Sequence, residues 1–128
     1  MKTTKKQKQM AAAMIGLLGA VAFGSCAEAE QKFQKLTGAQ IQAKFAGMEL
    51  TDEVHWSDLY ERNGTVLSSS MGRKRTGKWR VEKDQLCVEF ENEFEKCYEV
   101  RLSGKKVELR GEGSLPSDGV LEQPTGRK

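Results

Sequence analysis

Apolar and polar residues alternate along the chain between Gly77 and Leu109, and short polar segments interrupt the alternation. A period of two residues is typical of β-strands that bury one face only. The segment Lys83-Asp84 separates two such runs and predicts a tight turn between antiparallel strands. The apolar face of this first hairpin consists of Trp79, Val81, Leu86, Val88 and Phe90, with Val81 opposite Leu86 and Trp79 opposite Val88.

Two further turns are predicted in the same stretch. Asn92, a residue that tolerates left-handed backbone, lies at the centre of the second turn, and Gly104 lies in the third. Counting outward from Asn92 places Cys97 opposite Cys87, on the face away from the aromatic residues, and Phe94 opposite Phe90. The third hairpin pairs Val100 with Leu109, Leu102 with Val107, Arg101 with Glu108 and Glu99 with Arg110.

Upstream of this stretch, the pattern predicts one helix and a further hairpin. Thr37 and Gln40 have the spacing of a helix capping box, and the helix that they start carries Ile41, Phe45 and Met48 on one face until Gly47 ends it. Its apolar face is expected to cover an edge or an open end of the sheet.

The region from Val54 to Met71 predicts two strands around Asn63-Gly64, a typical hairpin turn. A two-residue loop would align Trp56 and Tyr60 with Met71 and Leu67, and a longer loop would shift that register by one.

The fold class is therefore mainly β, an antiparallel meander that forms a half-barrel or a small barrel, with one N-terminal α-helix and one disulfide. Near the C-terminus, Val120-Leu121 could add a short closing strand. The expected organisation is a signal peptide over 1–29, a lead-in over 30–36, a single domain over 37–122 and a flexible tail over 123–128.

The first 29 residues have the features of an export signal. An apolar run from Met10 to Phe23, too short to span a bilayer, follows four lysines, and Ala27-Glu28-Ala29 has the small residues of a cleavage site. Cleavage after Ala29 predicts a periplasmic or secreted protein. The alternative is a lipoprotein anchored at Cys26, because Phe23-Gly24-Ser25-Cys26 is an imperfect lipidation motif.

Removal of the leader changes the charge of the chain. The sequence has 21 Lys and Arg and 18 Asp and Glu, of which the leader contains four and one, so 17 of each remain. A formal charge of zero gives no indication of nucleic-acid binding. No nucleic-acid partner and no membrane-spanning segment are expected, although a lipid anchor at Cys26 stays open.

Disulfides are common in small exported domains, so the two cysteines outside the leader are predicted to form a Cys87–Cys97 disulfide. A metal site is not predicted, because the single histidine, His55, has no ligand spacing to either cysteine. No cofactor is predicted. Asp52 and His55 are close in sequence, but they lack a nucleophile partner, so no catalytic residue is proposed.

Two sets of residues are candidates for binding. One is a basic patch for an anionic site or protein partner, which contains Arg73, Lys74, Arg75, Lys78 and Arg80. The other is an apolar cavity, which would form if the sheet closes around Trp56, Tyr60, Trp79 and Phe90.

Several short motifs, spread from Leu36 to Leu121, resemble those of a family of small exported proteobacterial proteins with a domain of unknown function. They are Leu36-Thr37-Gly38, Gly64-Thr65, Met71-Gly72-Arg73, Gly77-Lys78-Trp79-Arg80, Leu86-Cys87 and Lys96-Cys97-Tyr98. The resemblance implies export and a compact domain, and it assigns no catalytic residue.

Together these observations favour an exported, non-enzymatic binding or interaction module whose partner in the periplasm is a protein or a small ligand. A small-ligand carrier with an apolar cavity inside a lipocalin-like barrel is the alternative, and a hydrolase or reductase is least favoured. A large internal pocket would favour the carrier.

Overall fold

A computed structural model describes residues 32–125 of the chain. The predicted signal peptide, its cleavage site after Ala29 and the candidate lipidation site Cys26 lie outside the described residues, as do the last three residues of the predicted tail. Within the described range, no helix is both long enough and apolar enough to cross a bilayer.

The described part of the chain forms one helix and nine strands. The elements are β1 (Gln34–Lys35), α1 (Gly38–Phe45), β2 (Met48–Thr51), β3 (Trp56–Tyr60), β4 (Thr65–Ser70), β5 (Arg73–Glu82), β6 (Gln85–Phe90), β7 (Lys96–Ser103), β8 (Lys106–Gly111) and β9 (Ser117–Glu122). The predicted lead-in contains β1, which pairs with β7 through Gln34 and Lys35.

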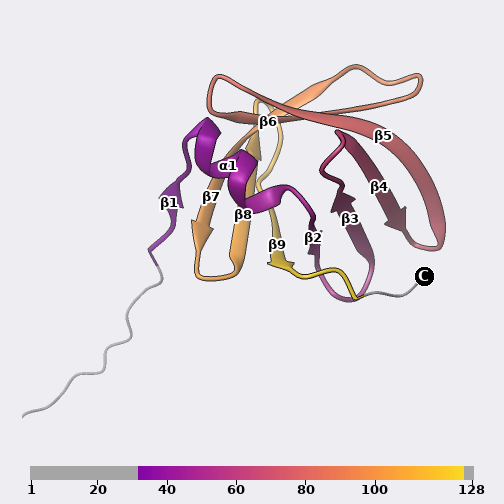
Figure 1. The fold of residues 1–128 in the computed structure, drawn as a ribbon, viewed down its shortest axis with the longest axis horizontal. Helices are drawn as coiled ribbons and strands as arrows, with labels where there is room; N and C mark the ends of the chain where they lie inside the picture. Colours follow the sequence, from indigo (N-terminus) through magenta and orange to yellow (C-terminus); the bar gives the residue numbers. More distant parts are fainter. Residues whose placement is uncertain (1–31, 126–128) are drawn as a thin grey trace, which may run out of the picture. The chain divides into compact units, whose positions relative to one another are not determined.

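The strands β2 to β9 form a closed barrel. Each strand pairs antiparallel with the next along the chain, and β9 returns to pair with β2, where Leu121 lies opposite Leu50. Figure 1 shows this continuous meander curling round on itself. The small barrel is thus the correct one of the two predicted forms, and closure removes the exposed edges that an open sheet would have.

The three predicted hairpins from β5 to β8 have the predicted registers. Lys83 and Asp84 have φ values of +49° and +60°, as a two-residue turn that matches strand twist requires. Asn92, with φ +67°, provides the left-handed residue of the second turn, and Cys97 lies opposite Cys87. The strand pairing ends at Val88 and Lys96, so Phe94 lies in the loop and does not pair with Phe90.

Helix α1 begins and ends where the sequence predicts, and it covers one end of the barrel. Thr37 is the N-cap and forms both bonds of the capping box with Gln40, while Ile41 and Phe45 are fully buried. The Gly38 N–H donates to Asp84 Oδ1 at 2.6 Å, which fixes the helix to the β5–β6 turn. Figure 1 shows α1 on that side of the barrel.

Met48 is a correction to the predicted helix face. Gly47 has φ +82° and breaks the helix, so Met48 begins strand β2 instead of continuing the helical stripe.

The hairpin of β3 and β4 has the longer of the two loops considered. Trp56 lies opposite Ser70 and Tyr60 opposite Val66. The Glu61 N–H donates to the Thr65 carbonyl, so the loop consists of the three residues 62–64. A shift of one residue exchanges the two faces of a strand. Val66 is therefore fully buried, while Leu67 is exposed on the outer wall.

Candidate functional site

A cavity of about 230 Å³ occupies the end of the barrel opposite α1. The β3–β4, β5–β6 and β7–β8 turns lie at the helix end, so the other end carries the loops β2–β3, β4–β5, β6–β7 and β8–β9. The cavity is lined by Trp56, Asp58, Tyr60, Ser68, Arg75, Val88, Phe90, Glu93, Phe94, Lys96, Tyr98, Leu109 and Ser117. Most of these residues are inward-facing positions of strands, so the barrel itself forms the walls.

Aromatic side chains form much of the cavity wall, and its floor rests on the core. Tyr60 is buried and makes edge-to-face contacts with Phe45 of the helix, at a centroid distance of 5.3 Å, and with Trp79, at 5.5 Å. Burial raises the pKa of Tyr60 well above its usual range. The floor is therefore an uncharged aromatic surface in contact with helix α1.

Of the four residues predicted to line an apolar cavity, Trp56, Tyr60 and Phe90 do so. Trp79 lies behind Tyr60 in the core, where its Nε1–H donates to the Glu61 carbonyl at 2.8 Å. Trp79 therefore supports the floor and does not face the cavity.

Two polar residues face each other inside this aromatic wall. Asp58 of β3 lies opposite Ser68 of β4. Burial raises the pKa of Asp58, and a hydrogen bond from Ser68 and the charge of Arg75 offset part of that increase. A carboxyl group held in a partly dry pocket can bind a cation or donate a hydrogen bond once protonated.

Arg75 of β5 crosses from the barrel wall to the β6–β7 loop. Its guanidinium lies over the Phe90 ring, 4.0 Å from the centroid, and its Nη1 donates to Glu93 Oε2 at 2.7 Å. Both partners of this ion pair are nearly half exposed, so water screens it and it contributes little to stability. Replacing this ion pair with contacts to a ligand therefore costs little free energy.

The predicted basic patch lies along β5, but strand alternation divides it between two faces. Arg73 and Arg75 lie on the face of Trp79, whereas Lys74, Lys78 and Arg80 lie on the opposite face.

On that opposite face, Arg80 is held by two glutamates. Its Nη2 and Nε donate to the two carboxylate oxygens of Glu95 at 2.8 and 2.9 Å, and its Nη1 donates to Glu82. The hydrogen bond from Arg80 lowers the pKa of Glu95. Lys78 lies opposite Glu89.

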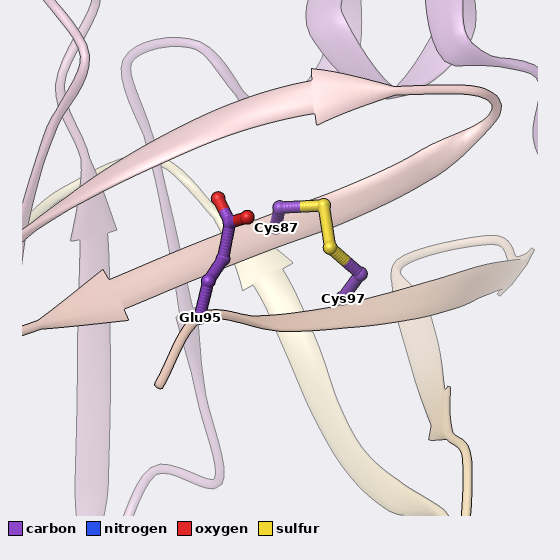
Figure 2. Close-up of side chains that lie close together, drawn as sticks. All are labelled: Cys87, Glu95 and Cys97. Carbon is purple, nitrogen blue, oxygen red and sulfur yellow. A yellow bond between two sulfur atoms is a disulfide. The ribbon is translucent and has the colours of Figure 1, made fainter. Parts of the chain in front are cut away.

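Cys87 and Cys97 form the predicted disulfide across β6 and β7, with a Cα–Cα distance of 3.9 Å. Figure 2 shows the bond between the two strands, with the Glu95 carboxylate on the same side. The carboxylate and the two sulfur atoms lie within 4.8 Å of one another, which is a metal-ligand spacing. Both sulfurs are used in the disulfide, however, and metals bind thiolates. This cluster therefore has a structural role in the oxidised protein.

Asp52 and His55 form the β2–β3 loop. Asp52 Oδ1 accepts the backbone N–H groups of Val54, His55 and Trp56, and its Oδ2 lies 2.9 Å from His55 Nδ1. Desolvation raises the pKa of Asp52, but these hydrogen bonds outweigh it and the net shift is downward. The carboxylate thus holds the loop in place.

Sequence reasoning missed the polar residues of the cavity. Ser68 is inward-facing only in the register of the three-residue loop, which the sequence left open. In either register, Asp58 shares the face of Trp56 and Tyr60, and Arg75 shares that of Trp79. The available signal was a charged residue at the alternate position between two aromatic ones, Trp56 and Tyr60.

The fold defines a small closed antiparallel β-barrel, an architecture compatible with a binding or carrier module. No family model matches the chain, and no curated protein or solved structure matches it either. Any functional conclusion therefore depends on the geometry of the barrel and its cavity.

Proposed function

We propose that the protein is an exported, non-enzymatic binding protein that holds a small ligand in the open end of its barrel. The observation that carries this proposal is the cavity between aromatic walls, closed below by Tyr60 and containing Asp58. Binding pockets for small molecules are mostly apolar, with a few polar groups that fix orientation. The cavity has this composition.

The volume and lining of the cavity restrict the ligand. At about 230 Å³ the cavity is smaller than the pockets of about 300–1,000 Å³ that hold drug-sized molecules. The ligand is therefore a small molecule or one end of a longer one. Its apolar part would contact Trp56 and Phe90, and its polar group would lie between Asp58 and Arg75.

Filling the cavity provides the direct test. Ser68 and Ser69 are neighbours on β4, but Ser68 lines the cavity and Ser69 does not. Ser68→Leu should reduce binding of an aromatic, anionic fluorophore, anilinonaphthalene sulfonate, at least tenfold, whereas Ser69→Leu should bind it like the parent. Equal binding by both variants would place the ligand elsewhere and contradict the proposal.

The two tryptophans offer a second readout. Trp56 lines the cavity and Trp79 does not. The ligand-induced change in intrinsic fluorescence should therefore disappear in Trp56→Phe and persist in Trp79→Phe.

A surface-binding role through the basic patch has less support. Strand alternation separates Arg75 from Lys74 and Lys78, and Arg80 already contacts two glutamates. The proposal therefore places binding inside the barrel.

Export is part of the proposal, and the Cys87–Cys97 disulfide supports it, because disulfides persist in oxidising compartments. The resemblance of the sequence motifs to those of small exported proteins also favours export. The mass of the protein purified from the periplasm should correspond to a chain that begins at Glu30. A mass that corresponds to a chain beginning with an acylated Cys26 would show that the carrier is anchored to a membrane by a lipid.

A further inference from the structure

Three neighbouring strands place two opposite charges and a hydroxyl in one row on the inner face of the barrel. Asp58 of β3 lies opposite Ser68 of β4, and Ser68 lies opposite Arg75 of β5. All three residues line the cavity, on the side of the barrel where Figure 1 shows β3, β4 and β5 next to one another. Paired strands lie about 4.8 Å apart, so Asp58 and Arg75 are two strand spacings from each other with Ser68 between them.

The charged residues of the cavity balance one another. Its lining contains two acidic residues, Asp58 and Glu93, and two basic ones, Arg75 and Lys96. A ligand with a single charge would leave an excess charge in this partly buried site. A ligand with one positive and one negative group would leave none, because each group would face a charge of opposite sign. The composition of the cavity therefore favours a zwitterion.

Each end of the row can bind one more charged group. Among residues 32–125, Asp58 takes part in none of the ion pairs, and the Ser68 hydroxyl that hydrogen-bonds to it is neutral. A ligand ammonium would therefore give this carboxylate a direct cationic partner. The Arg75 guanidinium has five N–H donors, and one of them, on Nη1, donates to Glu93. Its other donors can bind a ligand carboxylate, whose planar geometry matches the guanidinium.

Aromatic side chains lie beside both ends of the row. Trp56 and Tyr60 are the inward-facing neighbours of Asp58 on β3, and the guanidinium of Arg75 lies over the Phe90 ring, 4.0 Å from its centroid. A ligand side chain that covers these rings removes apolar surface from water. The face of an aromatic ring also attracts an ammonium group. The ligand is therefore expected to carry an apolar side chain next to its two charges.

We infer that the ligand is an α-amino acid with an apolar side chain, whose ammonium binds Asp58 and whose carboxylate binds Arg75. This inference rests on the proposed binding function and specifies the class of ligand. The two charged groups of an α-amino acid are attached to one carbon, so a molecule small enough for a cavity of about 230 Å³ can contact both ends of the row. Its side chain would pack against Trp56 and Phe90.

Calorimetric titration with ligands of matched shape tests the inference. L-Phenylalanine carries both charges, whereas 3-phenylpropanoate lacks the ammonium and 2-phenylethylamine lacks the carboxylate. The parent should bind L-phenylalanine at least tenfold more tightly than either analogue. L-Leucine, 4-methylpentanoate and 3-methylbutylamine provide the same comparison with a smaller side chain. The inference is overturned if neither amino acid binds, or if a singly charged analogue binds as tightly as its amino acid.

Two variants assign the two charged contacts. Asp58→Asn should lose the preference for L-phenylalanine over 3-phenylpropanoate, and Arg75→Gln should lose the preference over 2-phenylethylamine. The matched controls are Asp118→Asn on β9 and Arg73→Gln on β5, both exposed residues outside the cavity lining, and they should keep both preferences. Thermal unfolding verifies that each variant is folded. Preferences that survive in Asp58→Asn and Arg75→Gln would contradict the assigned contacts.

The fluorophore separates this inference from the proposed function. Ser68→Leu should weaken binding of L-phenylalanine at least tenfold, as it does that of anilinonaphthalene sulfonate, and Ser69→Leu should weaken neither. Fluorophore binding that depends on Ser68, together with no binding of either amino acid, would overturn the amino-acid ligand and leave the carrier function in place. Fluorophore and amino-acid binding that are both unaffected by Ser68→Leu would overturn the carrier function and this inference together.

Discussion

Asp58 affects both the chemistry of the cavity and the stability of the fold. Its carboxyl group lies on the inner face of β3, between Trp56 and Tyr60, and burial raises its pKa. An ionised carboxylate in such a place is poorly solvated, and a hydrogen bond from Ser68 compensates only part of the loss. A buried carboxyl group that reduces stability in the cavity wall is better explained by a ligand than by folding.

This argument predicts a pH-dependent effect of Asp58→Asn. In the unfolded chain the carboxyl ionises near its ordinary value of 3.8, whereas the folded protein retains the proton to higher pH. The Asp58 contribution to stability therefore falls as the pH rises from about 4 through the folded pKa. Urea unfolding should show the Asn variant more stable than the parent at pH 7, with the difference disappearing near pH 4.

Asp52 provides the control with the opposite sign. Its pKa is lowered by the loop hydrogen bonds that it accepts, so its contribution is present above its ordinary pKa and disappears as the pH falls. Asp52→Ala should therefore be less stable than the parent at pH 7, and the difference should shrink in acid. The same slope for both variants would contradict the assigned environments.

Met71 permits a prediction about backbone strain. Asparagine tolerates the left-handed backbone that Met71 adopts at φ +51°, so Met71→Asn should raise the free energy of unfolding by about 1 kcal/mol. Thermal unfolding measures the effect. A variant that is less stable would show that the methionine side chain contributes to packing.

At the scale of elements, the sequence predicts hairpins well where turn residues determine the register. Asn92 and Gly104 each have φ above +60°, and the apolar and charged pairs on both sides of their turns follow directly. Asn63-Gly64 is an equally strong turn signal, but its loop can contain two or three residues. That single uncertainty exchanges the faces of β4, so the inward position of Ser68 could not be predicted from the sequence.

Strand β2 could not be found from its sequence. Its four residues, Met48–Thr51, are too few for a period to be recognised, and Met48 also fits the apolar stripe of α1. What makes this segment a strand is tertiary pairing, with β3 on one side and β9 on the other. Local β-propensity predicts little where pairing with neighbouring strands determines the conformation.

The disulfide holds the β6–β7 hairpin, and its removal should lower stability without changing the fold. The bond closes a loop between residues ten apart, which predicts a loss of roughly 3 kcal/mol in Cys87→Ala/Cys97→Ala. The inward residues Leu86 and Tyr98 are untouched, so the same strand register should persist. Urea unfolding measures the loss, and the parent under reducing conditions is the control. Two free thiols in protein purified from the periplasm would contradict both the bond and the compartment.

At the scale of the whole molecule, the barrel depends on its last strand. β9 pairs with β8, where Val120 lies opposite Lys106, and with β2, where Leu121 lies opposite Leu50. Leu50 and Leu121 are both buried. One strand of six residues therefore completes two pairings and part of the core, and it closes the wall around the cavity.

Truncation tests whether this closure is required. A chain that ends at Pro116 lacks β9, so it loses the side chain of Leu121 and exposes Leu50 together with the edges of β2 and β8. Burial of one leucine contributes about 2–5 kcal/mol, a large part of the stability of a small domain, and the free edges favour association between chains. We expect this chain to lose cooperative unfolding and to associate, as measured by circular dichroism and sedimentation. A chain that ends at Glu122 retains β9 and should unfold within about 0.5 kcal/mol of the parent. If the shorter chain stayed monomeric and unfolded cooperatively, a half-barrel would be sufficient for the fold and the cavity wall would be free to open at β9.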